Sequence, residues 1–277
     1  MKPIYEPAGR AREYSEDGDS NLALNIYDGC PHGCLYCYVP LVLKCDRAQF
    51  HAHCEPRPGI VEATRKQLEK GVLISRRKMV NVSTWETDIV KSTIQLTGKS
   101  VFLCFTCDPF PADVSHEPTY QIIELLKSYG NSVQILTKNY PDDIDRICTL
   151  LDENDRYGVS FIKDTRERTV YEPNAPDYTE RCARQTLIKE VTGCKTFMSC
   201  EPVVDTKSVY EAITWLSGID QFRIGKLNYE WLLPPDLRPD IEWGAFGREA
   251  ERLCKEYGRG YLIKEDLRRE MDSTNIK

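Results

Sequence analysis

Three cysteines lie within eight residues of one another, at Cys30, Cys34 and Cys37, in the spacing C-x3-C-x2-C. Each thiolate of such a set can bind a different iron of a [4Fe-4S] cluster, and the fourth iron is then open to a small molecule. Gly29 and Gly33 stand next to Cys30 and Cys34, where they allow the backbone to bend tightly. The spacing therefore predicts a [4Fe-4S] cluster bound by Cys30, Cys34 and Cys37.

Two other interpretations of this segment stay open on the sequence alone. The thiols could be structural, or they could bind zinc together with His32 or a distant residue. Zinc sites favour paired C-x2-C knuckles, and a second pair at a suitable distance is missing. The ligand spacing therefore favours the cluster.

A second group of potential metal ligands follows directly, at Cys45, His51, His53 and Cys54. Cysteine and imidazole at this density could bind zinc or contribute to another site, but their spacing fits no standard zinc motif. We therefore expect a loop with solvated histidines. The scattered cysteines are expected to pack in the core, and these are Cys148, Cys182, Cys194, Cys200 and Cys254.

The composition limits the class of protein. Of the 277 residues, 41% are hydrophobic, which is enough for a sizeable core and excludes a disordered chain. The 37 basic and 43 acidic residues give a net charge of −6, which argues against a protein that coats polyanions by charge alone. Since the sequence shows no secretory signal and no long apolar run, we expect a cytoplasmic protein with no membrane partner and with reduced cysteines.

Short apolar runs recur along the chain, with helical periodicity between them, as at Tyr120, Ile123 and Leu126. Strands that alternate with helices pair in parallel through right-handed crossovers, and their carboxyl ends bind ligands. The predicted strands are Leu24–Tyr27, Val101–Cys107, Ser132–Thr137, Gly158–Ile162, Thr196–Cys200, Phe222–Leu227 and Tyr261–Ile263.

Six or seven such units are too few for a closed eight-unit barrel. We therefore predict an α/β fold built as a partial (β/α)6-type barrel of parallel strands, in preference to a doubly wound sheet. Residues 24–277 are expected to form this single domain. Residues 1–23 are expected to form an irregular leader, because they carry several prolines and glycines and an acidic stretch.

An aromatic residue, Tyr36, stands directly before Cys37. Together with Cys30 and Cys34, this pattern resembles the cysteine loop of the radical SAM superfamily. The Tyr-Cys-Tyr at residues 36–38 is similar to the spore photoproduct lyase and "DNA repair photolyase" branch, and the likeness spans roughly residues 20–270. Further similar segments are Thr106–Pro109, Leu136–Lys138 and Ser199–Pro202.

This resemblance implies a radical enzyme. In the superfamily, S-adenosylmethionine (SAM) binds the open iron of the cluster, and an electron splits it to give a 5′-deoxyadenosyl radical that abstracts hydrogen from a substrate. The resemblance also implies an electron donor, either a reductase or a flavodoxin-like or ferredoxin-like protein. It leaves the substrate unassigned, and it leaves open whether SAM is consumed.

The same resemblance implies residues that hold the cofactor at the ends of successive strands. Lys138 would pair with the SAM carboxylate, and Tyr36 would contact the adenine. Packing alone would also explain Tyr36, a surface loop would explain Lys138, and an ion pair between Glu201 and Lys226 would explain those two. The complete set of candidates is Tyr36, Cys107, Asp108, Lys138, Ser160, Glu201, Lys226 and Asn228.

The sequence departs from the lyase branch at the cysteine that returns a hydrogen atom to the substrate. That position is Phe105 here, with Cys104 and Cys107 on either side. Cys107 is therefore a weak catalytic candidate, and a thiol in a strand is more often a small packing residue.

The substrate could be a nucleic acid, because a group of basic residues precedes the second predicted strand. A solvated helix face is the more common meaning of such a group, and the sequence shows no aromatic ladder for single strands. We therefore keep two alternatives to a radical enzyme of unknown substrate: a nucleic-acid repair or modification enzyme, and a non-catalytic binding protein stapled by a metal. The basic residues are Arg65, Lys66, Lys70, Arg76, Arg77 and Lys78.

Overall fold

The computed structural model describes residues 2–7, 21–80, 87–163 and 170–273. Its centre is an eight-stranded sheet. The strands are β1 (Ile4–Tyr5), β2 (Asn21–Leu24), β7 (Ser100–Leu103), β8 (Ser132–Thr137), β9 (Arg156–Ser160), β10 (Lys195–Cys200), β11 (Gln221–Ile224) and β12 (Gly260–Ile263), which lie in this order. The first pair is antiparallel, and all later pairs are parallel.

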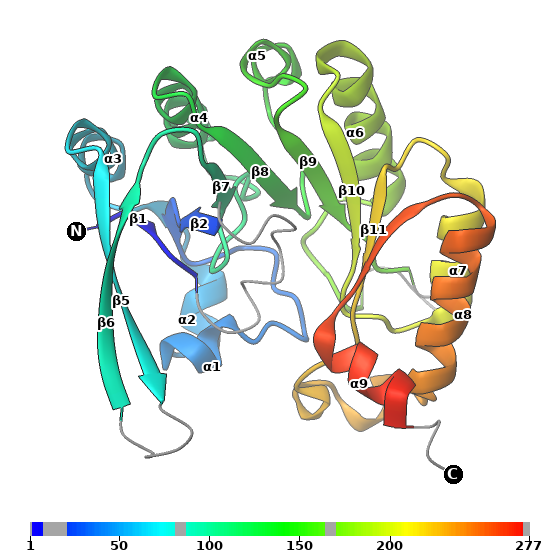
Figure 1. The fold of residues 1–277 in the computed structure, drawn as a ribbon. Helices are drawn as coiled ribbons and strands as arrows, with labels where there is room; N and C mark the ends of the chain where they lie inside the picture. Colours follow the sequence, from blue (N-terminus) through cyan, green and yellow to red (C-terminus); the bar gives the residue numbers. More distant parts are fainter. Residues whose placement is uncertain (1, 8–20, 81–86, 164–169, 274–277) are drawn as a thin grey trace.

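The parallel strands follow one another in the sheet as they do in the chain. A doubly wound sheet reverses its strand order at one point, whereas a (β/α) barrel adds each new strand on the same side. From β2 to β12 the order never reverses, and the sheet curves as an open arc (Figure 1). The predicted partial barrel is therefore confirmed, and no pairing among the described residues closes the arc.

Helices cover the outer side of the arc (Figure 1). They are α3 (Ile60–Glu69), α4 (Glu117–Ser128), α5 (Ile144–Leu150), α6 (Tyr178–Thr192), α7 (Thr206–Trp215) and α8 (Trp243–Glu256), whereas α9 (Glu265–Ser273) follows β12 and packs against α8. Ile123, Ile213 and Ala250 are fully buried, as the periodicity of one helix face requires. Asp143 and Asp205 begin α5 and α7, because their side chains accept the backbone N–H groups of the first turn.

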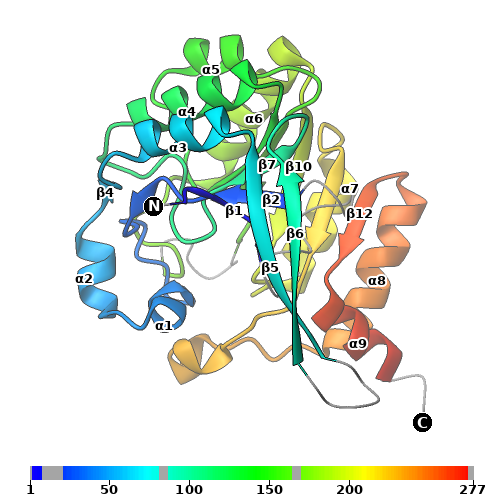
Figure 2. The ribbon, with the colours of Figure 1, turned by 60° about the vertical axis from the view of Figure 1, so that its left-hand side comes forward.

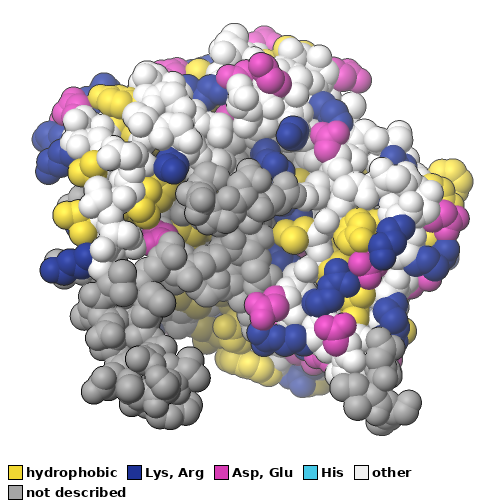
Figure 3. Space-filling view, in the orientation of Figure 1, with side chains coloured by type: hydrophobic (Ala, Val, Ile, Leu, Met, Phe, Trp, Pro, Cys, Tyr) yellow, Lys and Arg dark blue, Asp and Glu magenta, His cyan; other side chains and the backbone are white. Residues whose placement is uncertain are grey.

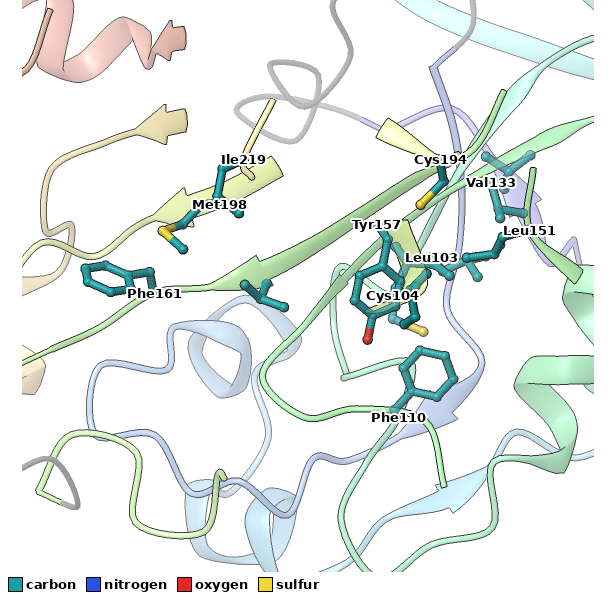
Figure 4. Close-up of a cluster of buried hydrophobic side chains, with 14 of the residues drawn as sticks. Leu103, Cys104, Phe110, Val133, Leu151, Tyr157, Phe161, Cys194, Met198 and Ile219 are labelled. Carbon is teal, nitrogen blue, oxygen red and sulfur yellow. The ribbon is translucent and has the colours of Figure 1, made fainter. Parts of the chain in front are cut away.

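The core joins side chains from neighbouring strands. Leu103 and Tyr157 are fully buried and lie together, and Met198 lies further along the sheet (Figure 4). A Cβ atom at Gly158 would lie 2.2 Å from the ring of Phe197. The absence of a side chain at Gly158 therefore leaves room for the Phe197 ring of the adjacent strand.

Several strands end earlier than the sequence predicts. The strand predicted over Val101–Cys107 ends at Leu103, because Cys104 adopts a left-handed φ of 71°. Likewise, β2 ends at Leu24 and β11 ends at Ile224. The loops that line the carboxyl edge of the sheet therefore begin sooner than predicted.

A long antiparallel hairpin of β5 (Val72–Val80) and β6 (Thr87–Gln95) was not predicted. It leaves the barrel after α3 and extends beyond α1 (Val39–Leu43) and α2 (Arg47–Ala52) (Figures 1 and 2). The six basic residues do not share one helix face, because Arg65, Lys66 and Lys70 belong to the end of α3, whereas Arg76, Arg77 and Lys78 lie on β5. Glu62 on α3 pairs with both Arg65 and Lys66.

The first residues of the expected irregular leader form a strand. Ile4 pairs with Leu24 across β1 and β2 and is fully buried, and its N–H and carbonyl are bonded by the side chain of Gln67. Residues 8–20 of the predicted leader lie outside the described residues. The barrel domain therefore includes a segment that the sequence analysis left out of it.

Basic and acidic side chains alternate over the face shown in Figure 3, so its described part carries no extended field of one sign. Within the described ranges, no helix is long and apolar enough to span a membrane.

Candidate functional site

A cavity of about 580 Å³ lies at the carboxyl ends of the parallel strands. The loop after β3 (Tyr27–Asp28) and the loops after β7 to β12 line it, which is where (β/α) barrels bind ligands. Every site residue that the sequence predicts lies in its wall, and these are Cys30, Cys34, Tyr36, Cys37, Cys107, Asp108, Lys138, Ser160, Glu201, Lys226 and Asn228.

The cysteine segment runs along one side of the cavity, with Cys34 buried and Cys30 and Cys37 half-buried. Gly29 and Gly33 adopt positive φ values of 83° and 66°. A Cβ atom at Gly29 would lie 1.7 Å from the carbonyl oxygen of His53, so the close approach requires glycine. The two glycines therefore do allow the tight turns that the sequence predicts.

Arg47 on α2 holds the cysteine segment together from behind. Its guanidinium donates hydrogen bonds to the carbonyl oxygens of Cys34 at 2.6 Å, Leu35 at 2.6 Å and Cys37 at 2.7 Å. A planar guanidinium offers several donors in a fixed arrangement, so one side chain fixes three carbonyl directions. The sequence analysis missed Arg47, because nothing in the local pattern shows that α2 folds back onto this loop.

Burial sets the protonation of the three thiols. Burial raises the pKa of Cys34 to about 12 and also raises the pKa of Cys30 and Cys37, so the ligand-free loop holds neutral thiols. In the part of the chain that the structure describes, no three His, Cys, Asp or Glu side chains converge on one point. Three thiolates from one short loop can each bind a different iron of a [4Fe-4S] cluster.

Asp108 is a buried residue of the cavity wall, and its carboxylate is hydrogen-bonded by the protein. It accepts hydrogen bonds from the Thr137 hydroxyl at 2.6 Å, the Phe110 N–H at 2.9 Å and the Lys138 N–H at 2.8 Å. His32 Nδ1 lies 3.5 Å from it, and burial lowers the pKa of His32, so the imidazole is neutral. Asp108 therefore positions the backbone of Lys138 and has little capacity left for a ligand.

Lys138 reaches from the end of β8 into the cavity. Its Nζ donates to the Ser160 hydroxyl at 3.1 Å and lies 5.8 Å from the centre of the Tyr36 ring. Burial by itself would lower the pKa of Lys138, but Glu172, then Cys34 and Asp108, raise it, so the amine stays charged. Ser160 is its one hydrogen-bond partner among the described residues, which leaves donors for a ligand.

A buried charged group stands behind Tyr36 and was not predicted. Glu172 accepts a hydrogen bond from the Tyr36 hydroxyl and pairs with Arg181 at 2.7 Å. Arg181 also donates to the carbonyl oxygen of Ser160 at 3.0 Å. Burial would raise the pKa of Glu172, but Arg181 and Lys138 hold it below its usual value. The group therefore joins the cysteine loop to the strand that bears Ser160.

Glu201 and Lys226, which follow β10 and β11 in the cavity wall, pair with residues other than each other. Glu201 lies 3.8 Å from Lys264, whereas Lys226 pairs with Glu270 of α9. The ion pair between Glu201 and Lys226, which the sequence analysis kept as an alternative explanation of these residues, is replaced by these two pairs, because α9 supplies the carboxylate that Lys226 contacts. Asn228 donates to Asp266 on the same helix at 2.8 Å. Lys264 is a further wall residue that the sequence analysis left out of its candidate set.

The second group of potential metal ligands does not come together among the described residues. His51 Nδ1 bonds the Cys30 carbonyl at 2.9 Å, and His53 pairs with Glu55 at 3.4 Å. The Cys54 thiol contacts the Gly29 carbonyl at 3.6 Å. His51 and Cys54 therefore contact the backbone of the cysteine loop from outside.

Solved structures of spore photoproduct lyase are similar to the structure of this chain. Spore photoproduct lyase complexed with dinucleoside spore photoproduct aligns over 90% of this chain and 77% of that chain, with a TM-score of 0.60 and 14% identity. A mutant of the same lyase aligns over the same shares with a TM-score of 0.62 and 14% identity. The chain has the fold of spore photoproduct lyase. No protein-family model and no curated protein sequence matches it.

Another spore photoproduct lyase structure contains bound AdoMet, which is SAM, together with dinucleoside spore photoproduct. It aligns over 90% of this chain and 78% of that chain, with a TM-score of 0.59 and 14% identity. The shared fold thus accommodates SAM in spore photoproduct lyase. At this identity the likeness concerns the fold, and the cavity residues must carry the functional argument for this chain.

Proposed function

We propose that this protein is a radical SAM enzyme that binds a [4Fe-4S] cluster through Cys30, Cys34 and Cys37 and cleaves SAM reductively. The observation that carries the proposal is that these thiols and the predicted SAM-binding residues line one cavity in the fold of spore photoproduct lyase. When bound, the cluster and SAM supply a 5′-deoxyadenosyl radical. A reductase or a flavodoxin-like or ferredoxin-like protein would deliver the electron.

The residues of the chain then orient SAM and exclude water. The Lys138 amine, directed by Ser160 and held charged by Glu172, pairs with the SAM carboxylate. Tyr36 is fixed through Glu172 and offers its ring and backbone to the adenine. Cys107, Glu201, Lys226 and Asn228 complete the polar wall, and Asp108 acts through the backbone of Lys138.

A second candidate function is the repair or modification of a nucleic acid. Tyr38 and Tyr229 line the cavity at its solvent side, where they stack with ring centres 6.0 Å apart, and Trp231 meets Tyr229 edge-on at 6.3 Å. All three are exposed, Trp231 by 61%. The sequence shows no aromatic ladder, but the folded chain assembles a short one from two distant segments. Exposed aromatic rings that lie next to one another can stack on the unpaired bases of a single strand.

The experiment that tests the first proposal is anaerobic. The chain is reconstituted with iron and sulfide, reduced with dithionite and incubated with SAM, and 5′-deoxyadenosine is measured by chromatography. We expect its formation in the wild type and in Cys148→Ala, and its loss in Cys37→Ala, because two thiolates hold the cluster poorly.

The outcomes separate the alternatives. A stable cluster with no SAM affinity by calorimetry would support the non-catalytic, metal-stapled protein. If the reconstituted chain binds zinc and no cluster, the proposal of a radical SAM enzyme is wrong.

A further inference from the structure

We propose that Tyr5 and Thr106, oriented by Asn25, form a subsite that binds a carbonyl-bearing group of the substrate by hydrogen bonds. Tyr5 ends β1, Asn25 follows β2 and Thr106 follows β7, and these three strands are neighbours in the sheet. Tyr5 and Thr106 line the cavity. Neither is among the residues proposed above to hold the cluster or SAM, and the inference rests on the proposed function, because it assigns part of the same cavity to the substrate.

The amide of Asn25 leaves the hydrogen of the Tyr5 hydroxyl unused. Asn25 Oδ1 accepts a hydrogen bond from the Thr106 N–H at 3.1 Å, and Asn25 Nδ2 donates one to the Tyr5 hydroxyl at 2.9 Å. A backbone N–H can only donate, so the amide oxygen must face Thr106 and the amide nitrogen must face Tyr5. The Tyr5 hydroxyl is therefore the acceptor, and its own hydrogen has no partner among the described residues.

This hydrogen stays on Tyr5 at neutral pH. Burial raises the pKa of Tyr5 to about 12, and the hydrogen bond from Asn25 offsets this only in part. A neutral phenol can donate one hydrogen bond while it accepts another. Tyr5 can therefore donate to an acceptor atom of a molecule in the cavity.

The hydroxyl of Thr106 also lacks a protein partner. Its oxygen is buried and makes no hydrogen bond within the described ranges of the chain. The backbone around it is held by the bond to Asn25 and by the Cys104 N–H, which donates to the Leu24 carbonyl at 2.8 Å. Most buried hydroxyls are paired, so an unpaired one in a cavity wall indicates a ligand group that pairs with it. The Asn25 amide bonds both residues, so they lie close enough to contact one small ligand.

The surroundings of the subsite are aromatic. Phe102 and Phe105 stack with ring centres 4.1 Å apart, and both line the cavity. Apart from the buried Asp108, whose carboxylate is hydrogen-bonded by the protein, the charged residues among the described cavity residues follow β8, β10, β11 and β12, further along the arc (Figure 1). A planar ring can pack against aromatic side chains, and neutral hydroxyls suit an uncharged polar edge.

These properties define the chemical class of the ligand group. Its carbonyl oxygen would accept from Tyr5, and an N–H beside the carbonyl would donate to Thr106. The subsite therefore fits a neutral planar lactam, in which the carbonyl and the N–H lie side by side on one ring.

The subsite is tested with 2-pyridone, a planar lactam, and with 2-methoxypyridine, which keeps the ring but lacks the carbonyl and the N–H. Each is titrated into the reconstituted full-length chain, and binding is followed by saturation-transfer NMR. We expect the wild type to bind 2-pyridone more tightly than 2-methoxypyridine. Tyr5→Phe and Thr106→Val should each weaken the binding of 2-pyridone by about two- to tenfold, which is the effect of one hydrogen bond, and leave that of 2-methoxypyridine unchanged.

The variant Asn25→Asp separates hydrogen bonding from packing. The aspartate still accepts the Thr106 N–H, but its second oxygen accepts the Tyr5 hydrogen in place of the ligand. This variant should therefore lose affinity for 2-pyridone as Tyr5→Phe does, although Tyr5 itself is retained. The matched control is Tyr257→Phe, which removes the hydroxyl of an exposed tyrosine after α8 and should bind both probes as the wild type does.

Equal affinity of the wild type and Tyr5→Phe for 2-pyridone, or no preference for 2-pyridone over 2-methoxypyridine, would overturn the subsite. SAM binding is measured by calorimetry in the same samples and should not change in Tyr5→Phe, because a loss would place Tyr5 in the cofactor site and also overturn the proposal. If no cluster assembles, the radical SAM proposal fails. Binding of 2-pyridone to the chain as purified then still tests the subsite, because its hydrogen bonds join protein groups alone.

Discussion

Replacing Glu172 by Gln should destabilise the protein strongly, because the carboxylate is buried among charged partners. Glu172 is 5% exposed and pairs with Arg181, which is 2% exposed, while Lys138 stands close by. Removing one member of a buried ion pair costs about 3–5 kcal/mol, and the glutamine keeps one acceptor, so we expect about 3 kcal/mol. At about 2–4 °C per kcal/mol, the melting temperature should fall by about 6–12 °C.

The assay is urea denaturation followed by circular dichroism, with Glu211→Gln as the matched control. Glu211 pairs with Lys163 at 3.2 Å on the surface, where both side chains are more than a quarter exposed. Exposed pairs contribute about 0–1 kcal/mol, so this control should change little.

The stability difference should also depend on pH in a defined direction. The folded pKa of Glu172 lies below its usual 4.5, so its stabilisation is present above about pH 4.5 and is lost as the pH falls through the folded pKa. The gap between the wild type and Glu172→Gln should therefore narrow in acid. A glutamine variant within about 1 kcal/mol of the wild type at neutral pH, or a gap that widens in acid, would refute this reasoning.

Three further predictions concern the site. Arg47→Ala should lower the iron bound per chain after reconstitution, because three carbonyls of the cysteine loop lose their donor, and unchanged iron would contradict this. Lys138→Met should weaken SAM binding by about tenfold or more in calorimetry, which corresponds to about 1.4 kcal/mol for the lost ion pair; equal affinity would remove Lys138 from the site. If nucleic acid is the substrate, Tyr229→Ala and Trp231→Ala should each weaken binding of a fluorescent single-stranded oligonucleotide at low salt, by about 1–3 kcal/mol per stacked base. Trp215→Ala, which removes an exposed ring on α7, is the control, and equal losses in all three variants would exclude the row as a base platform.

The barrel could be predicted because each strand and helix is indicated by residues that lie close together in the sequence. Apolar runs and helical faces such as Ile123 and Ile213 follow from periodicity, and parallel pairing follows from their alternation. The strand ends were less predictable, since the left-handed Cys104 interrupts an apolar run that continues to Cys107. The hairpin was missed because the segment Arg76–Lys78 has no apolar alternation.

Sequence reasoning found the residues of the cavity wall but few of their partners. Glu172 and Arg181 stand far from the cysteine motif in the chain, and their pairing depends on a tertiary contact that no spacing shows. An ion pair between Lys226 and Glu201 was one alternative because both residues end strands, but helix α9 supplies Glu270 instead. Strand ends can thus be placed from the sequence, whereas the direction of a charged side chain depends on what packs beside it.

The order of the sheet has a consequence for how the protein is made. From β7 onward, each parallel strand pairs with the parallel strand synthesised just before it, so the growing chain can extend the sheet as it leaves the ribosome. The cysteine segment is synthesised before strands β7 to β12, whereas Lys264 follows the last of these strands. The cysteine thiols are therefore synthesised before the segments that complete the cavity wall. During translation they stay accessible to solvent until the last strands have folded.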